Sequence, residues 1–159
     1  TRLWNAAKAT GISLPFTKKE LFETVQSVIK ENEMHDGVHV RIMVTRGIKK
    51  TPSQDPRLII SGPNLVIIPE YKLANLESKQ KGIKLFTSTF RRGSPDYLDP
   101  KLNCHSKLHE VQALVQAIEA GADEALMLDV HGFVSTCNST NFFIVKNNIV
   151  YSLAFVLGR

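Results

Sequence analysis

The sequence predicts a mixed α/β (α+β) protein, and three patterns support this class. Apolar residues recur at helical intervals between Leu21 and Ile29, as in an amphipathic helix. Apolar and polar residues alternate from Val38 to Thr45 with the period of two that is typical of a strand. Residues 108–146 then show a helical stripe followed by short apolar runs separated by turn residues. Helices and strands therefore both contribute to the fold.

The composition is that of a globular protein and excludes several functional classes. Of 159 residues, 43% are hydrophobic and 22% are charged, and no apolar run or signal-peptide pattern predicts a membrane span or secretion. Cys104 and Cys137 are too few for a disulfide framework and lack metal-ligand spacing, which favours the cytoplasm and predicts no metal site. The net charge of +5 comes from scattered Lys and Arg, so we expect a basic surface that attracts small anions rather than nucleic acid.

In the first half of the chain, residues 1–9 are predicted to form a helix. Thr17 and Glu20 have the spacing of a capping box, which starts the next helix. Three strands follow, the last two around the Gly62-Pro63 turn, at 38–45, 58–61 and 65–68.

A polar segment, 71–81, precedes the second half, and we place a domain boundary near Gln80. The predicted domains are a small N-terminal α/β domain, 1–80, and a large domain, 81–159. Ser106 is the predicted N-cap of a helix that ends near Gly121, whose missing Cβ suits a left-handed residue. The strands predicted in this half are 83–90, 124–130, 133–135 and 141–146.

The polar run from Thr136 to Thr140 is predicted to be an irregular loop between two apolar strands. Its hydroxyls and backbone N–H groups are suited to an anion, most of all a phosphate. A solvated hairpin loop remains the alternative from local pattern.

The segment G-A-D-E-A-L-M-L-D-x-x-G-F-V, the polar loop and N-F-F-I-V-K together resemble the class IV aminotransferases. This resemblance implies a two-domain fold type IV enzyme that binds pyridoxal 5′-phosphate between its domains and forms homodimers. It implies an aminotransferase that acts on an amino acid or amine and a 2-oxo acid. It also suggests that both domains are partial and that the chain is a fragment truncated at both ends.

The resemblance assigns roles to two arginines. Arg2-Leu3 and Ala6-Ala7-Lys8 are similar to a family segment whose arginine binds the cofactor phosphate, a task for which a guanidinium is suited. Arg41 matches the arginine that receives a substrate carboxylate in branched-chain aminotransferases, with an exposed strand arginine as the equal alternative. The run after Gly47 lacks the Arg and His that D-amino-acid aminotransferases place there, which argues against that member.

The family's catalytic lysine has no direct counterpart, because its position falls on Asn103 when the pattern is laid on Asp99-Pro100 without a gap. Lys101 and Lys107 flank this position. We predict Lys107 as the catalytic amine, placed in the first helical turn, while the alternative is that no lysine serves this role.

A second departure from the family pattern lies at Thr136, where the family has a glutamate that pairs with the pyridine nitrogen. A hydroxyl makes the ring a weaker electron sink, so a lyase of the same fold is one alternative. Ser139 and Thr140 match the positions that hold the phosphate. A non-catalytic family member is the other alternative, and Asn103 supports it.

Overall fold

The computed structural model describes residues 2–152 and divides the chain into two compact units, Thr1–Ala74 and Asn75–Arg159. Each unit is described by itself. This division places Gln80 inside a short helix of the second unit, α3 (Leu76–Lys81). No helix among the described residues is long and apolar enough to cross a membrane.

The first unit begins with two helices, α1 (Arg2–Ala9) and α2 (Lys18–Glu31). The predicted capping box is confirmed at the start of α2. The backbone N–H of Thr17 donates to Glu20 Oε2 at 2.7 Å, and the N–H of Glu20 donates to Thr17 Oγ1 at 3.2 Å. These bonds satisfy amides that have no intrahelical partner, which fixes where α2 begins.

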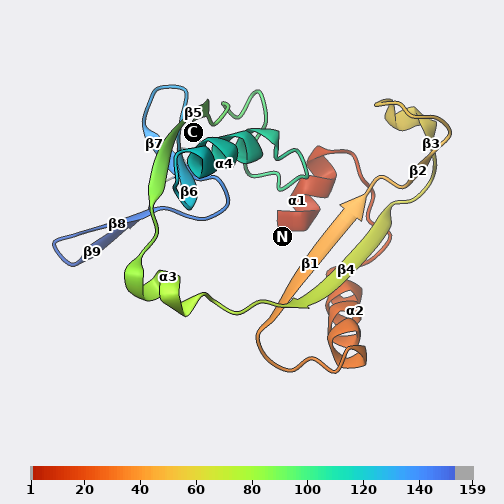
Figure 1. The fold of residues 1–159 in the computed structure, drawn as a ribbon. Helices are drawn as coiled ribbons and strands as arrows, with labels where there is room; N and C mark the ends of the chain where they lie inside the picture. Colours follow the sequence, from red (N-terminus) through yellow and green to blue (C-terminus); the bar gives the residue numbers. More distant parts are fainter. Residues whose placement is uncertain (1, 153–159) are drawn as a thin grey trace. The chain divides into compact units, whose positions relative to one another are not determined.

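An antiparallel ribbon of β1 (Val38–Thr45) and β4 (Asn64–Tyr71) also belongs to the first unit, and α2 packs against β4 (Figure 1). The predicted bounds of β1 are confirmed, and β4 is longer than predicted. Opposite residues in a ribbon share a face, so Val40 lies beside Pro69 and Ile42 beside Ile67. Arg41 lies opposite Ile68 on the other face.

Beyond β1, the chain turns through β2 (Ile48–Lys49) and returns in β3 (Ile59–Ser61). Gly47 is required at this crossing, because it has a φ of +97° and an added Cβ would lie 1.9 Å from the carbonyl oxygen of Ser61.

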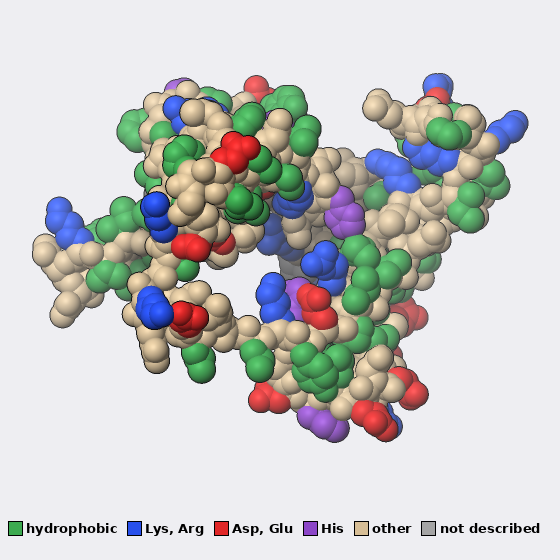
Figure 2. Space-filling view, in the orientation of Figure 1, with side chains coloured by type: hydrophobic (Ala, Val, Ile, Leu, Met, Phe, Trp, Pro, Cys, Tyr) green, Lys and Arg blue, Asp and Glu red, His purple; other side chains and the backbone are tan. Residues whose placement is uncertain are grey.

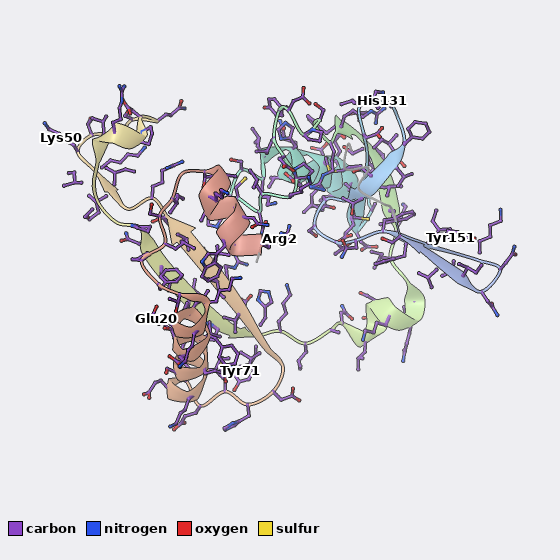
Figure 3. All side chains as sticks on the ribbon, turned by 180° about the vertical axis from the view of Figure 1, so that it is seen from behind. Arg2, Glu20, Lys50, Tyr71, His131 and Tyr151 are labelled. Atoms are coloured by element: carbon purple, nitrogen blue, oxygen red, sulfur yellow. The ribbon has the colours of Figure 1, made fainter. Side chains whose placement is uncertain are left out.

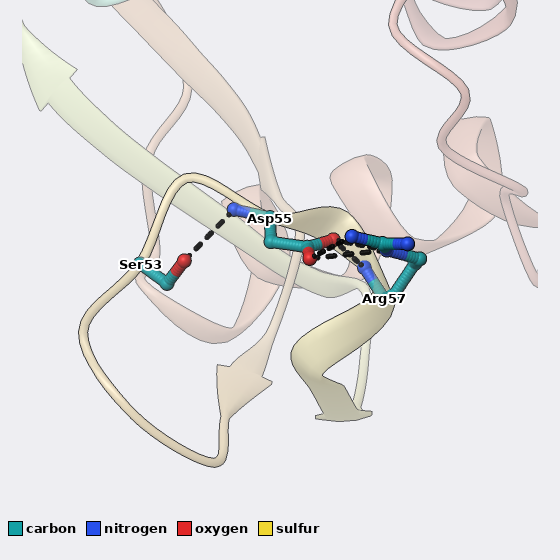
Figure 4. Close-up of polar contacts among 3 residues, drawn as sticks. All are labelled: Ser53, Asp55 and Arg57. Atoms are coloured by element: carbon teal, nitrogen blue, oxygen red, sulfur yellow. Dashed lines mark hydrogen bonds and ion pairs between the residues drawn. The ribbon is translucent and has the colours of Figure 1, made fainter.

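Between β2 and β3, the 3₁₀ turn η1 (Pro56–Leu58) is capped by Asp55, which accepts from the Arg57 N–H at 2.9 Å. The Arg57 guanidinium also bonds this carboxylate, and Ser53 Oγ accepts from the Asp55 N–H at 3.1 Å (Figure 4). These contacts with Arg57 lower the pKa of Asp55.

In the second unit, β5 (Leu85–Arg91), β6 (Glu124–Leu128) and β7 (Val134–Cys137) form a three-stranded sheet in that order. Because β5 and β6 are parallel, they need a crossover, and α4 (Leu108–Glu119) provides it (Figure 1). Against both strands, α4 packs through small residues. The buried core consists of Ala113, Ala117, Ala122, Ala125 and Met127, with Phe86 and Phe90 beside it.

The two ends of α4 test the predicted bounds. Its C-cap is Ala120, and Gly121 follows with a φ of +68°, as predicted. The predicted N-cap, Ser106, is wrong by one residue, because Lys107 is the N-cap and makes no side-chain cap bond. The Lys107 carbonyl accepts the first helical bond, from the Val111 N–H at 3.0 Å, so Lys107 precedes the first turn.

The hairpin of β8 (Phe143–Lys146) and β9 (Ile149–Ser152) turns at Asn147 and Asn148, which both have positive φ. Its apolar side chains are exposed on both faces, with Val145 69% and Tyr151 49% accessible. Figure 2 shows these hydrophobic side chains at the surface of the hairpin, in the left part of the view.

Candidate functional site

A pocket opens at the N-terminal end of α4 in the second unit. Its cavity volume is about 40 Å³, and the rest of the hollow is open to solvent. The loop between β5 and α4, the first turn of α4 and one residue of β6 line it. The lining residues are Arg92, Gly93, Tyr97, Leu98, Asp99, Pro100, Leu102, Cys104, Ser106, Lys107, His109, Glu110 and Met127.

One carboxylate organises the charges in this pocket. Arg92 Nη2 donates to Glu110 Oε1 at 3.3 Å, and Lys107 Nζ lies 3.9 Å from the same oxygen. The Glu110 side chain is 16% exposed and that of Arg92 is 21% exposed, so this ion pair is largely withdrawn from water. Lys107 is 48% exposed, which leaves its ammonium accessible from the pocket. No sequence pattern predicts that Arg92 pairs with Glu110, because 18 positions separate these two residues.

The two candidate lysines differ in their position relative to the pocket. Lys107 lines it, whereas Lys101 is exposed and does not belong to the lining. The backbone N–H of Lys101 donates to Asp99 Oδ1 at 2.9 Å, which holds this residue in the preceding turn. Asn103, on which the ungapped family pattern is predicted to place the lysine, is also exposed and outside the lining.

Met127 connects the pocket with β7. Its side chain is fully buried and lines the pocket, and its partner across the β6–β7 ladder is Thr136. Thr136 and Cys137 belong to β7, so the prediction that they lie in an irregular loop is wrong. Paired residues share a face of the sheet, so Thr136 faces the same side as Met127. Its hydroxyl donates to the carbonyl oxygen of Thr140 at 2.9 Å.

The β7–β8 loop, residues 138–142, is fastened to the start of β6. Asn138 is buried, its Oδ1 accepts from the Ala125 N–H at 2.8 Å, and its own N–H donates to the Ala125 carbonyl at 2.9 Å. Glu124 accepts from Ser139 Oγ at 3.1 Å and from Thr140 Oγ1 at 2.6 Å. Glu124 and Asn138 are thus the residues that sequence reasoning missed, because these bonds join positions 13 to 16 apart.

The Cys137 thiol is next to this cluster and is buried. Burial raises the pKa of Cys137, and the Glu124 carboxylate raises it further, while a hydrogen bond with Thr140 opposes the shift. A thiol that resists ionisation is a poor nucleophile, so Cys137 serves packing.

The first unit holds the two arginines singled out from the sequence. Arg2 is exposed in the first turn of α1 (Figure 3). Arg41 is exposed on β1, and its guanidinium makes no hydrogen bond or ion pair with residues 2–152. Arg46, which the sequence did not single out, donates to the carbonyl oxygen of Thr10 and so ties the end of β1 to the end of α1.

Known proteins resemble this chain over most of its length. The family model described as amino-transferase class IV matches residues 1–157. A branched-chain-amino-acid aminotransferase-like protein of Arabidopsis thaliana is 36% identical over 94% of this chain, which covers 26% of that protein. The branched-chain-amino-acid aminotransferase of Pseudomonas aeruginosa is 30% identical over 95% of the chain, which covers 49% of it.

Solved structures show the same fold. The T.th. branched-chain amino acid aminotransferase with pyridoxamine 5′-phosphate matches with a TM-score of 0.79 and 26% identity, over 95% of this chain and 49% of that one. The chain thus spans between a quarter and a half of the length of these relatives. Because the family model covers nearly every residue, the chain belongs to the class IV aminotransferase family.

Proposed function

We propose that this chain is part of a pyridoxal-phosphate-dependent aminotransferase that moves an amino group between an amino acid or amine and a 2-oxo acid. Family membership supports the reaction class, since the relatives are branched-chain aminotransferases by name. The observation that carries the proposal is the position of Lys107, which is the lysine that lines the pocket among the described residues.

The residues of the chain fit the cofactor in part. The accessible amine of Lys107 suits an aldehyde, and the backbone N–H groups of Ser139 and Thr140 make no hydrogen bond within residues 2–152, which leaves them available to a phosphate. The hydroxyls of Ser139 and Thr140 are already bonded to Glu124. We therefore assign phosphate binding to these amides and to the Arg2 guanidinium.

The cofactor, when bound, supplies an electron sink and carries the amino group between the two substrates. Lys107 would hold the cofactor through its amine and would move the proton at the substrate Cα. Arg41 receives a substrate carboxylate, for which its unpartnered guanidinium is suited. Thr136 would lie toward the pyridine ring of the cofactor, although its hydroxyl proton is donated to the carbonyl oxygen of Thr140.

The test is to map the amine that takes up the cofactor. The full-length protein is mixed with pyridoxal phosphate, reduced with borohydride and digested, and the modified lysine is identified by mass spectrometry. We expect a visible absorbance band before reduction and a label on Lys107. A label on Lys101 would move the assignment, and the absence of any label would contradict the proposal.

A lyase of the same fold is the alternative that Thr136 favours, because a hydroxyl cannot keep the ring nitrogen protonated. Half-reactions with a panel of amino acids separate the two reactions. An aminotransferase accumulates pyridoxamine phosphate, whereas a lyase releases its product and regenerates the aldehyde form.

A non-catalytic family member is the alternative that Asn103 favours, since an amide cannot bond to an aldehyde as an amine does. In that case the protein binds pyridoxamine phosphate, but reduction with borohydride in the presence of pyridoxal phosphate labels no lysine. We also propose that the intact protein is a cytoplasmic homodimer, which light scattering of the purified full-length protein and fractionation of cells would test.

A further inference from the structure

The Glu110 carboxylate in the pocket lies between two cations that compete for one of its oxygens. Arg92 Nη2 donates a hydrogen bond to Glu110 Oε1 at 3.3 Å, whereas Lys107 Nζ lies 3.9 Å from the same oxygen, too far for a hydrogen bond. The other acid in the lining, Asp99, accepts from the backbone N–H of Lys101. Within residues 2–152, Glu110 is therefore the acid that forms an ion pair with the Lys107 amine.

The fold fixes the ion pair between Arg92 and Glu110. The backbone N–H of Arg92 donates to the carbonyl oxygen of Leu128 at 2.8 Å, which ties Arg92 to the end of β6. Glu110 lies in the first turn of α4, and both side chains are largely withdrawn from water, so solvent screens their attraction less than that of a surface pair. Lys107 is more exposed, and its contact with Glu110 is the weaker of the two.

The partner of Glu110 matters for the chemistry of the lysine. An ammonium cannot attack a carbonyl carbon, because its nitrogen has no free electron pair. A carboxylate in close contact with an ammonium favours this charged form. If Glu110 turned from Arg92 to Lys107, the lysine would therefore react more slowly with an aldehyde.

We propose that Arg92 is a positioning residue that keeps Lys107 available to an aldehyde by engaging Glu110. Arg92 acts through the carboxylate and needs no contact with the reacting atoms. This inference rests on the proposed function only where the aldehyde is that of the cofactor, since the reaction of Lys107 with a small aldehyde is independent of it.

The test measures the reductive methylation of Lys107 in the full-length protein at low salt. The uncharged amine adds to formaldehyde and loses water, and cyanoborohydride reduces the resulting carbon–nitrogen double bond to a methylamine. Mass spectrometry gives the rate at Lys107 relative to the exposed Lys101 of the same sample. We expect Arg92→Gln to lower this relative rate about threefold, the effect of a partly exposed ion pair. An unchanged or higher rate would overturn the inference, and unfolding cannot imitate the expected result because it would expose Lys107.

Two further variants test whether Arg92 acts through Glu110. Glu110→Gln and the double variant Arg92→Gln/Glu110→Gln should methylate Lys107 equally fast, because neither retains the carboxylate that Arg92 engages. If Arg92→Gln slowed the reaction as much in the Glu110→Gln background as in the wild type, Arg92 would act by its own charge and the inference would fail.

Arg91→Gln is the matched control for the loss of one positive charge. Arg91 is exposed, donates to the carbonyl oxygen of Ser88 and does not line the pocket, so this variant should methylate Lys107 as the wild type does. A loss as large as that of Arg92→Gln would assign the effect to net charge and overturn the inference.

Pyridoxal phosphate separates this inference from the proposed function. Trapping with borohydride measures how fast the cofactor labels Lys107, and we expect Arg92→Gln to slow this label as well. If formaldehyde gives the expected order but pyridoxal phosphate labels no lysine, the inference on Arg92 holds and the proposed cofactor fails. If pyridoxal phosphate labels Lys107 equally fast in the wild type and in Arg92→Gln, the proposed function holds and the inference is overturned for the cofactor.

Discussion

The pocket beside α4 and the β7–β8 loop carry similar groups but differ in how many of them are available. In the pocket, Lys107 has a single distant partner, Glu110 at 3.9 Å, and remains half exposed. In the loop, the hydroxyls of Ser139 and Thr140, which the family resemblance predicts to bind phosphate, are both bonded to Glu124. A residue of the right type at the right position is therefore not yet a binding group, because its donors must also be free.

The largest expected effect tests the pocket. Lys107→Ala removes the amine that we assign to proton transfer, and we expect turnover of the full-length protein to fall by about 10²- to 10⁴-fold. Lys101→Ala is the matched control and should retain the activity of the wild type, because Lys101 does not line the pocket. Turnover is measured as the rate of 2-oxo acid formation. Similar losses of turnover in the two variants would contradict the assignment of proton transfer to Lys107.

Met127 tests whether the pocket and the loop depend on the same core. Its fully buried side chain lines the pocket and faces the same side as Thr136, so Met127→Ala leaves a cavity under both. We expect the free energy of unfolding to fall by about 2–5 kcal/mol in urea denaturation. Met127→Leu nearly conserves volume and should cost less than about 1.5 kcal/mol. A small loss in the alanine variant would mean that the core collapses to fill the space.

Asn138 tests how the loop is fastened. Asn138→Ala leaves the buried N–H of Ala125 without its acceptor, and we expect a loss of about 1–3 kcal/mol in the free energy of unfolding. Ser139→Ala, which changes an exposed hydroxyl, should stay within about 0.5 kcal/mol of the wild type. If the serine variant lost more stability than the asparagine variant, Glu124 rather than Asn138 would be the main anchor of the loop.

The smallest expected change in stability concerns the two cysteines, Cys104 and Cys137. Because the pKa of Cys137 is raised in the folded state, the folded protein retains this proton at pH values where the unfolded chain releases it. The free energy of unfolding should therefore decrease slightly as the pH rises from about 8 to about 10, and Cys137→Ser should remove that decrease. Iodoacetamide should modify Cys104, which lines the pocket, before Cys137. The reverse order would show that the loop opens readily.

Much of the fold follows from local sequence rules. The Thr17–Glu20 capping box, the period of two in β1 and the glycine after α4 each depend on neighbours within a few positions, and each is confirmed. The short helix α3 escapes prediction because its polar residues leave no apolar stripe to detect. Local pattern predicts a loop at Thr136 and Cys137 because this run has small, polar side chains. The backbone of both residues nevertheless pairs with β6 in the β6–β7 ladder.

The candidate site depends more on contacts between distant positions. The resemblance to the family pattern predicts Lys107 and Thr136 as candidates, but no spacing rule predicts that Arg92 pairs with Glu110 or that Glu124 binds the loop hydroxyls. The Arg92–Glu110 pair arises because α4 connects the parallel strands β5 and β6, and the Glu124 contacts arise from the antiparallel pairing of β6 with β7. Both bring together groups that local patterns treat as unrelated.

The β8–β9 hairpin has a consequence for handling the protein. Within residues 2–152, β8 and β9 pair only with each other in a two-stranded ribbon, and apolar side chains exposed on both of its faces favour the stacking of further strands. Lys146, which closes β8 just before the turn, is a charged residue that discourages such stacking. Concentrated preparations of this chain should therefore aggregate first through the hairpin, and a second charge in place of Val145 or Val150 would improve its solubility.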